Sequence, residues 1–223
     1  MQAITDTKHL TVQTLPPILV LTGEDVGQFE WLKKDILKKI GYDPSDLNYS
    51  YFDMKEASYA EVELDLVSLP FFADEKIVIL DHLLDLTTAK KRYLTDEDLK
   101  QFENYLENPS ESTHLLIFAE GKLDSKRRLV KLLKRDAQII EATTPKEQEV
   151  KRYFASQAQE LGLQFVGDSL DQLLLKSGYD FGELQKNLAL LQAYKEDGQI
   201  TLEDIEEVVP KSLQDNIFDL TQM

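Results

Sequence analysis

Cysteine is absent from the 223-residue sequence, and the three histidines lie far apart, at His9, His82 and His114. Without thiols, the chain forms no disulfides and no Cys-ligated metal site. The histidine spacing indicates neither a metal cluster nor a catalytic triad. The sequence therefore predicts no metal and no other cofactor.

Long apolar runs are missing as well. No stretch of 18 apolar residues occurs, and the opening residues MQAITDTKHLTVQTLPP (1–17) contain no apolar core of the signal-peptide type. A chain without disulfides also suits a reducing compartment. These absences together predict a cytoplasmic protein with no membrane partner.

Positive charge is scarce: 25 Lys and Arg face 41 Asp and Glu, which gives a net charge of −16. This balance argues against a broad, sequence-independent affinity for nucleic acid, because such affinity needs cations that neutralise phosphates. It leaves room for a local basic patch. Apolar residues make up 42% of the chain, which is enough for a packed core.

Residues 1–144 alternate short apolar runs with helical patterns. Apolar runs bounded by turn residues predict strands at 17–23, 76–80, 114–120 and 137–142, and alternating aromatic and polar residues predict a fifth at 47–54. Apolar residues at helical spacing, often with a capping residue before them, predict helices at 25–41, 58–69, 95–108 and 124–136. Strands that alternate with helices favour right-handed crossovers. We therefore expect an α/β fold, with a mostly parallel five-stranded sheet and helices on both faces.

The pattern changes near Pro145, after which no strand is predicted. Four helical segments separated by Gly or capping residues indicate a small all-α helical bundle over 145–212. The final residues, DNIFDLTQM (215–223), have the apolar spacing of another amphipathic helix. We expect 213–223 to be the start of a further domain.

The turn after the first predicted strand, TGEDVGQFE (22–30), is where a phosphate-binding loop would lie. Such a loop needs G-x-x-x-x-G-K-[ST], with Lys and a hydroxyl side chain for the phosphates and magnesium. Here Gly23 and Gly27 are four positions apart instead of five, and Gln28 and Phe29 replace the Lys and the Ser or Thr. Glu24 and Asp25 would also repel a phosphate at the helix N-terminus. The sequence therefore predicts that this chain does not hydrolyse nucleotides.

Other catalytic signatures are missing too. Asp81 follows the third predicted strand, where nucleotide-hydrolysing proteins hold magnesium, but without a phosphate loop we interpret Asp81 and His82 as turn residues. The serines lack a G-x-S-x-G context, and the carboxylates are too numerous to single out a pair. No catalytic residue is predicted.

One concentrated basic segment stands out in this acidic chain, at KLDSKRRLVKLLKRD (122–136). Its basic residues are Lys122, Lys126, Arg127, Arg128, Lys131, Lys134 and Arg135. They are either a solvated helix face, with cations favoured near the helix C-terminus, or a contact for an acidic partner or for DNA. The sequence leaves both interpretations open.

The segment VSLPFFADEKIVIL (67–80) places two aromatic residues at a turn. Pro70 ends the preceding helix, and the adjacent Phe71 and Phe72 cannot both point into one core from a regular element. They either fold back under the sheet or form an exposed apolar plug for a partner's pocket. Composition favours neither interpretation.

Several segments, taken in order, resemble the delta subunit of the bacterial DNA polymerase III clamp loader. They are PILVLTGED (17–25), DLVSLPFFADEKIVIL (65–80), HLLIFAEGKLDSKRRLVKLLKR (114–135), DFGELQKNLALLQAY (180–194) and LQDNIFDLTQM (213–223). The resemblance covers nearly the whole chain from residue 17. It implies an AAA+-like α/β domain over 1–144, a small helical lid domain over 145–212, and at 213–223 the start of a truncated C-terminal collar domain.

The resemblance also implies a function. Delta subunits do not hydrolyse ATP; they bind the sliding clamp (the beta subunit) through a hydrophobic wedge and open the ring for loading onto primed DNA. The wedge maps onto the residues Ser68, Leu69, Pro70, Phe71 and Phe72. The implied partners are the clamp, the ATPase clamp-loader subunits, delta-prime and, through the complex, primer–template DNA.

Two alternatives bear on this interpretation. A degenerate P-loop ATPase that still binds or hydrolyses nucleotide is the competing function from another class. The sister subunit of the same loader would need a Cys-rich zinc module and an S-R-C motif, and neither exists in a chain without cysteine.

Overall fold

The computed structural model describes residues 1–71, 73–195 and 197–210. The chain divides into two compact units, one over residues 2–144 and the other from residue 145 onward. The strands of the first unit are β1 (Ile18–Gly23), β2 (Tyr49–Asp53), β3 (Lys76–Asp81), β4 (Thr113–Glu120) and β5 (Gln138–Ala142). Its helices are α1 (Gln2–Thr7), α2 (Val26–Lys39), α3 (Tyr59–Val67), α4 (Asp96–Glu107) and α5 (Arg128–Asp136).

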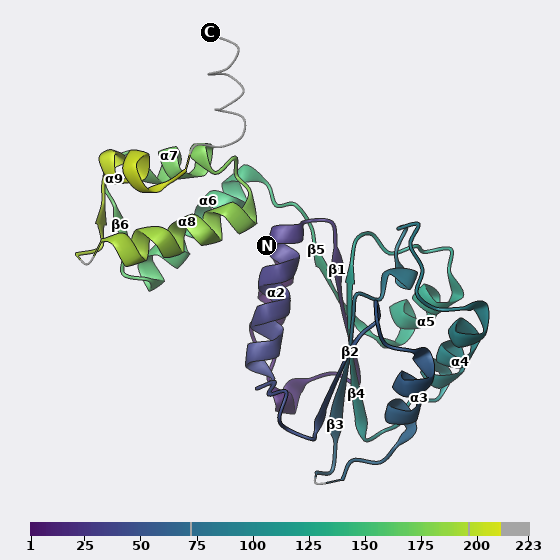
Figure 1. The fold of residues 1–223 in the computed structure, drawn as a ribbon. Coiled ribbons are helices and arrows are strands. Elements are labelled where there is room, and N and C mark those ends of the chain that lie inside the picture. The colour runs from purple at the N-terminus through teal and green to yellow at the C-terminus, as the bar shows by residue number, and fades with distance from the viewer. Residues whose placement is uncertain (72, 196, 211–223) are drawn as a thin grey trace. The chain divides into compact units, whose positions relative to one another are not determined.

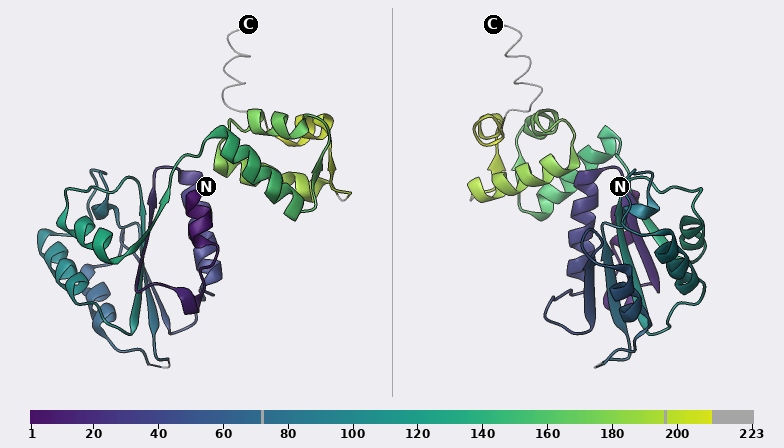
Figure 2. Two further views of the ribbon diagram at one scale, coloured as in Figure 1. Left: turned by 180° about the vertical axis from the view of Figure 1, so that it is seen from behind. Right: turned by 45° about the vertical axis from the view of Figure 1, so that its right-hand side comes forward.

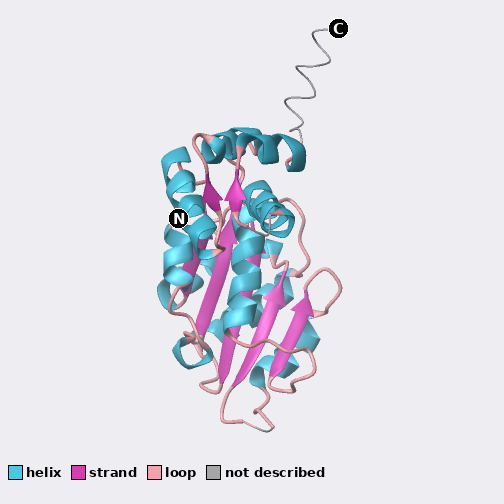
Figure 3. Ribbon diagram, turned by 90° about the vertical axis from the view of Figure 1, so that its left-hand side faces the viewer, coloured by secondary structure: helices cyan, strands magenta, loops and turns pink. Residues whose placement is uncertain are grey.

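The five strands form one parallel sheet in the order β2-β3-β4-β1-β5 (Figure 3). Helices α3, α4 and α5 cover one face and α2 covers the other (Figure 1), and the same division is visible from behind (Figure 2). The predicted α/β fold, with its five-stranded parallel sheet and flanking helices, is confirmed.

Successive residues of β1 supply the two cores in turn, because neighbouring side chains of a strand point to opposite faces. Ile18 and Val20 pack into the cluster under α3, α4 and α5. Leu19 and Leu21 pack into the cluster under α1 and α2. Burial on both faces explains why β1, β3 and β4 read as continuous apolar runs, whereas the half-exposed β2 alternates aromatic and polar residues.

Capping side chains fix the helix starts that the sequence predicted. Ser58 and Glu61 form a reciprocal capping box at the start of α3, and Thr95 accepts a hydrogen bond at the start of α4. The predicted start at 124 is wrong, since α5 begins at Arg128. Residues 122–124 pair instead with residues 86–88, where the Thr88 amide donates to the Lys122 carbonyl at 2.9 Å.

The first 15 residues, for which no element was predicted, contribute to the core. They form α1 and a 3₁₀ turn at Val12–Thr14. Ala3, Leu10 and Leu15 are buried in the cluster beneath α2.

The second unit contains the four predicted helices: α6 (Glu147–Glu160), α7 (Ser169–Lys176), α8 (Phe181–Tyr194) and α9 (Leu202–Val208). It also contains a short parallel pair that the sequence did not predict, β6 (Gln164–Phe165) with β7 (Gln199–Ile200). Two-residue strands are too short to show an alternating pattern. The helix expected at 215–223, within the predicted 213–223 segment, lies outside the described residues.

Candidate functional site

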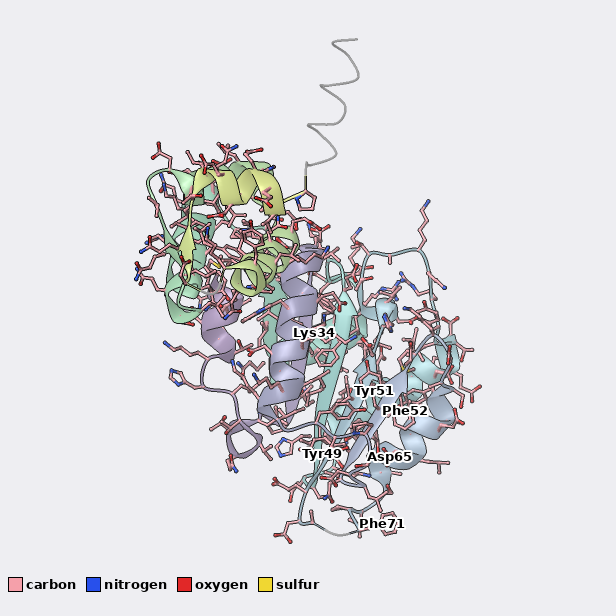
Figure 4. All side chains as sticks on the ribbon, turned by 60° about the vertical axis from the view of Figure 1, so that its left-hand side comes forward. Lys34, Tyr49, Tyr51, Phe52, Asp65 and Phe71 are labelled. Carbon is pink, nitrogen blue, oxygen red and sulfur yellow. The ribbon has the colours of Figure 1, made fainter. Side chains whose placement is uncertain are left out.

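The loop between α3 and β3 carries the residues of the predicted wedge. Leu69 is 76% exposed and Phe71 is 85% exposed, whereas Pro70 is half-buried. Figure 4 places Phe71 at the periphery of the unit, beyond the body of the sheet. Phe71 therefore does not fold back under the sheet. Phe72 lies outside the described residues.

The outer face of α3 adds two apolar side chains that sequence analysis did not single out. Leu64 is 71% exposed and Val67 is 60% exposed, and they are three positions apart, so they lie on one helix face. The opposite face of the helix, including Val62 and Leu66, is buried. Apolar residues on both sides of a short helix were the sequence signal that could have indicated an exposed apolar face. Four large apolar side chains within residues 64–71 thus face solvent.

Ser68 differs from its neighbours because its hydroxyl points toward the base of the loop. The hydroxyl donates to the Asp65 carbonyl at 3.0 Å and accepts from the Lys76 ammonium at 2.7 Å. Lys76 itself is only 5% exposed. The five predicted wedge residues thus include one, Ser68, whose polar group is already engaged within the protein.

The predicted basic set is partly engaged in internal contacts. Arg127 donates to the Asp85 carbonyl at 2.7 Å and pairs with Asp124 at 3.2 Å. Arg128 forms an ion pair of 2.6 Å with Glu107, so it links α5 to α4. Both arginines hold the unit together.

The remaining basic side chains of this segment are exposed. Arg135 pairs with the adjacent Asp136, and Lys134 donates to a serine hydroxyl at 2.8 Å. Among the described residues, no carboxylate pairs with Lys122, Lys126 or Lys131. Together with Lys134, whose partner is a neutral hydroxyl, these three lysines are the part of the predicted set whose positive charge is exposed to solvent and not paired with a carboxylate among the described residues.

A second group of cations, at Lys90, Lys91 and Arg92, lies in the loop that follows β3. All three are exposed, and the Arg92 guanidinium donates to backbone carbonyls. An antiparallel bridge between Thr87 and Leu123 brings this loop alongside the start of the basic segment. The sequence signal, AKKRY at 89–93, was present but had not been connected with the other segment.

The turn after β1 is closely packed against β5, and a side chain of the chain caps the helix that follows it. Gly23 has a φ of +133°, and an added Cβ would lie 2.1 Å from the Ala142 carbonyl oxygen of β5. The Asp25 carboxylate accepts a hydrogen bond from the Gln28 amide at 2.8 Å at the start of α2. The helix N-terminus, which elsewhere binds phosphates, is therefore occupied by a carboxylate of the chain itself.

Asp81 is not the turn residue that the sequence suggested: it ends β3 and is 3% exposed. Lys33 of α2 forms an ion pair with it, and the Tyr51 hydroxyl donates to the same carboxylate oxygen. Burial is the larger cause and the hydrogen bond to Asp81 the next, and together they raise the pKa of Tyr51. The hydroxyl therefore stays protonated and remains a donor at neutral pH. The Lys33 ammonium therefore lies directly against the Asp81 carboxylate.

Within the part of the chain that the structure describes, no group of three or more His, Asp or Glu side chains has the arrangement of a metal site. In the same residues, none of the helices has both the length and the apolar composition needed to cross a bilayer.

Comparison with known proteins decides the family. The family model described as "DNA polymerase III, delta subunit" matches residues 19–143, more than half of the chain. The chain belongs to the DNA polymerase III delta subunit family. The resemblance noted from the sequence motifs is therefore confirmed.

Individual relatives of this delta-family chain agree. It is 28% identical over 219 residues to the DNA polymerase III subunit delta of Bacillus subtilis (strain 168), covering 96% of this chain and 62% of the relative. Among solved structures, the Bacillus subtilis DNA clamp loader delta protein (YqeN) has a TM-score of 0.67 at 24% identity, covering 98% of this chain and 65% of that one. The delta-family chain thus spans less than two thirds of either relative.

A more distant structure shares the fold alone. A mutant of Thermotoga maritima RuvB has a TM-score of 0.54 at 12% identity, and the match covers 85% of this chain and 60% of that one. In the delta-family chain, the match at 19–143 includes the loop between α3 and β3 and both basic segments. These features therefore lie in the part of the chain that matches the family model.

Proposed function

We propose that this delta-family chain is a clamp-loader subunit that binds the sliding clamp through the loop between α3 and β3. The observation that carries the proposal is the exposure of Leu69 and Phe71, at 76% and 85%, on a short connection between two regular elements. With Phe72 and the turn-forming Pro70 they make the wedge, and Leu64 and Val67 extend its apolar surface.

Burial of these side chains supplies the binding energy. Moving two large apolar side chains from water into a partner's pocket is worth roughly 3–6 kcal/mol. Aromatic side chains in such pockets are common hot spots, and a loop held at both ends loses little entropy on docking.

Opening of the ring follows from differential affinity. A ligand shifts a conformational equilibrium only as far as it prefers one form. The wedge binds one clamp subunit in the shape that is compatible with an open interface, and so holds the ring open for loading onto primed DNA.

The chain performs this work without hydrolysing nucleotide. The start of α2 is capped by Asp25, and Asp81 is paired with Lys33, so the positions that would hold phosphate and magnesium are filled by the protein. In the assembled loader, ATP binds to the ATPase subunits, and delta-prime and the clamp complete the set of protein partners. Primer–template DNA reaches the chain within that complex.

Titration of the chain against its sliding clamp by surface plasmon resonance tests the proposal. The double variant Phe71→Ala with Phe72→Ala should keep its circular dichroism spectrum and lose clamp binding. Full-strength binding by the folded double variant would remove the wedge assignment. Calorimetry with Mg-ATP addresses the alternative, a degenerate ATPase: no binding heat is expected, and saturable heat would support the alternative.

The basic side chains favour a second contact, with the phosphate backbone of DNA. Lys90, Lys91 and Arg92 follow closely after Thr88, whose amide donates to the Lys122 carbonyl, so their loop continues from a segment paired with the one that carries Lys122 and Lys126. No carboxylate pairs with these five side chains in the described part of the chain. Uncompensated cations on neighbouring loops are what phosphate neutralisation requires.

Salt dependence separates this contact from a merely solvated surface. With primer–template DNA at low ionic strength, Lys90→Gln, Lys91→Gln and Lys126→Gln together should lower the log–log salt slope by about 2–3. A control that removes the same number of charges, Lys34→Gln, Lys38→Gln and Lys55→Gln at exposed positions, should leave the slope unchanged. Equal slopes for both variants would argue against DNA contact at the two loops.

A further inference from the structure

Lys76 is a buried cation at the base of the wedge loop. It is the first residue of β3 and is only 5% exposed, although lysine is rarely buried without a partner. Its ammonium donates to the Asp65 carbonyl, lies 3.2 Å from an Asp65 carboxylate oxygen and donates to the Ser68 hydroxyl at 2.7 Å. The three donors of the ammonium thus have three acceptors, all near the end of α3.

These contacts complete the C-terminus of α3, where the last carbonyls have no partner within the helix. The Ser68 hydroxyl and Lys76 both donate to the Asp65 carbonyl. The Thr113 hydroxyl of β4 donates to the Leu66 carbonyl at 3.4 Å. Side chains from β3 and β4 therefore do here what a C-terminal glycine does at many other helices.

The same contacts close the wedge loop. Ser68 and Lys76 flank residues 69–75, and their hydrogen bond of 2.7 Å joins the two ends of that segment. Without the contacts of Lys76 to Asp65 and Ser68, the side-chain hydrogen bond from Thr113 to the Leu66 carbonyl would be left to tie the end of α3 to the sheet. The exposed Leu69 and Phe71 would then sample more orientations, and a smaller fraction of molecules would present them correctly.

We propose that Asp65, Ser68 and Lys76, together the Lys76 bracket, are positioning residues that fix the clamp-binding loop and do not themselves touch the clamp. This inference rests on the proposed function of the wedge. It removes Ser68 from the residues that contact the partner, because its hydroxyl already donates and accepts within the protein.

Binding kinetics distinguish a positioning residue from a contact residue. A loss of preorganisation lowers the fraction of binding-competent molecules and slows association, whereas a lost contact speeds dissociation. In surface plasmon resonance against the sliding clamp, we expect Lys76→Met to bind about tenfold and Ser68→Ala about threefold more weakly, mainly through slower association. The Ser68 and Lys76 amides, which donate to the Leu64 and Ser112 carbonyls at 3.2 and 2.9 Å, should exchange hydrogen faster in both variants.

Two matched variants serve as controls. Ser68→Thr keeps the hydroxyl at a position whose extended backbone accepts a branched side chain, and it should bind within about twofold of wild type. Lys100→Met removes an exposed lysine from α4 and should bind like wild type. If Lys76→Met fails to fold, comparison of Ser68→Ala with Ser68→Thr still tests the proposal, because only the first variant should associate more slowly with the clamp.

Binding of both Lys76→Met and Ser68→Ala within about twofold of wild type would overturn the Lys76 bracket. A loss carried entirely by faster dissociation would also overturn it, since that result makes Ser68 a contact residue. Leu69→Ala with Phe71→Ala separates the two proposals. If that variant binds at full strength, the wedge function itself fails; if it does not bind while the bracket variants bind normally, only the bracket fails.

Discussion

Truncation of Leu69 and Phe71 to alanine should abolish clamp binding without affecting folding. Because these side chains are 76% and 85% exposed in the protein alone, their loss should change the free energy of unfolding by no more than about 0.5 kcal/mol. If both become buried in the clamp, binding loses roughly 3–6 kcal/mol. That range corresponds to a dissociation constant about 10²- to 10⁴-fold higher.

Leu66→Ala provides the matched control, because it removes the same kind of side chain from a neighbouring position. Leu66 is 0% exposed, so its truncation should lower the free energy of unfolding by about 2–5 kcal/mol. Urea denaturation followed by circular dichroism measures stability, and titration over immobilised clamp measures affinity. At a temperature where Leu66→Ala is folded, its clamp affinity should stay near that of wild type.

Two results would refute the reasoning about this loop. One is a folded Leu69→Ala, Phe71→Ala variant whose affinity stays within about threefold of wild type, a change far below that expected from burial. The other is a stability loss comparable to that of Leu66→Ala, which would place the two side chains in the core of the free protein.

Three further predictions concern the scaffold. Lys33→Met leaves the buried Asp81 carboxylate without its cation and should lower the free energy of unfolding, measured by urea denaturation, by about 3–5 kcal/mol. A loss below about 1 kcal/mol would contradict the importance of this ion pair. Gly23→Ala should cost about 3 kcal/mol or more, because its Cβ would lie 2.1 Å from a β5 carbonyl oxygen; a wild-type melting temperature would disprove the clash. The hydrogen bond from Lys195 lowers the pKa of Asp204 from 3.8 to about 2, so its contribution is fully present above about pH 4 and is lost as pH falls through about 2. In Asp204→Asn, the free energy of unfolding in urea should therefore fall less between about pH 4 and pH 2 than in wild type. The same pH dependence in both proteins would count against this role of Asp204.

Local sequence patterns were sufficient for the framework of the fold. Apolar runs marked four strands of the sheet, alternating aromatic and polar residues marked β2, and the Ser58–Glu61 pair marked the start of α3. The spacing of Gly23 and Gly27 argued against a phosphate loop. These features depend on residues close together in the chain, so the amino-acid order alone determines them.

The pairing of charges and the exposure of the wedge were decided only by the tertiary structure. Lys33 and Asp81 are 48 positions apart, and Arg128 reaches Glu107 from 21 positions away. The sequence showed a basic segment but not which cations find carboxylates on other elements. The sequence did not distinguish a buried from an exposed Phe71, because a turn has no periodic pattern that separates a buried face from an exposed one. Burial and ion pairing depend on contacts between segments that are distant in sequence. Those contacts form only when the sheet and its helices pack together.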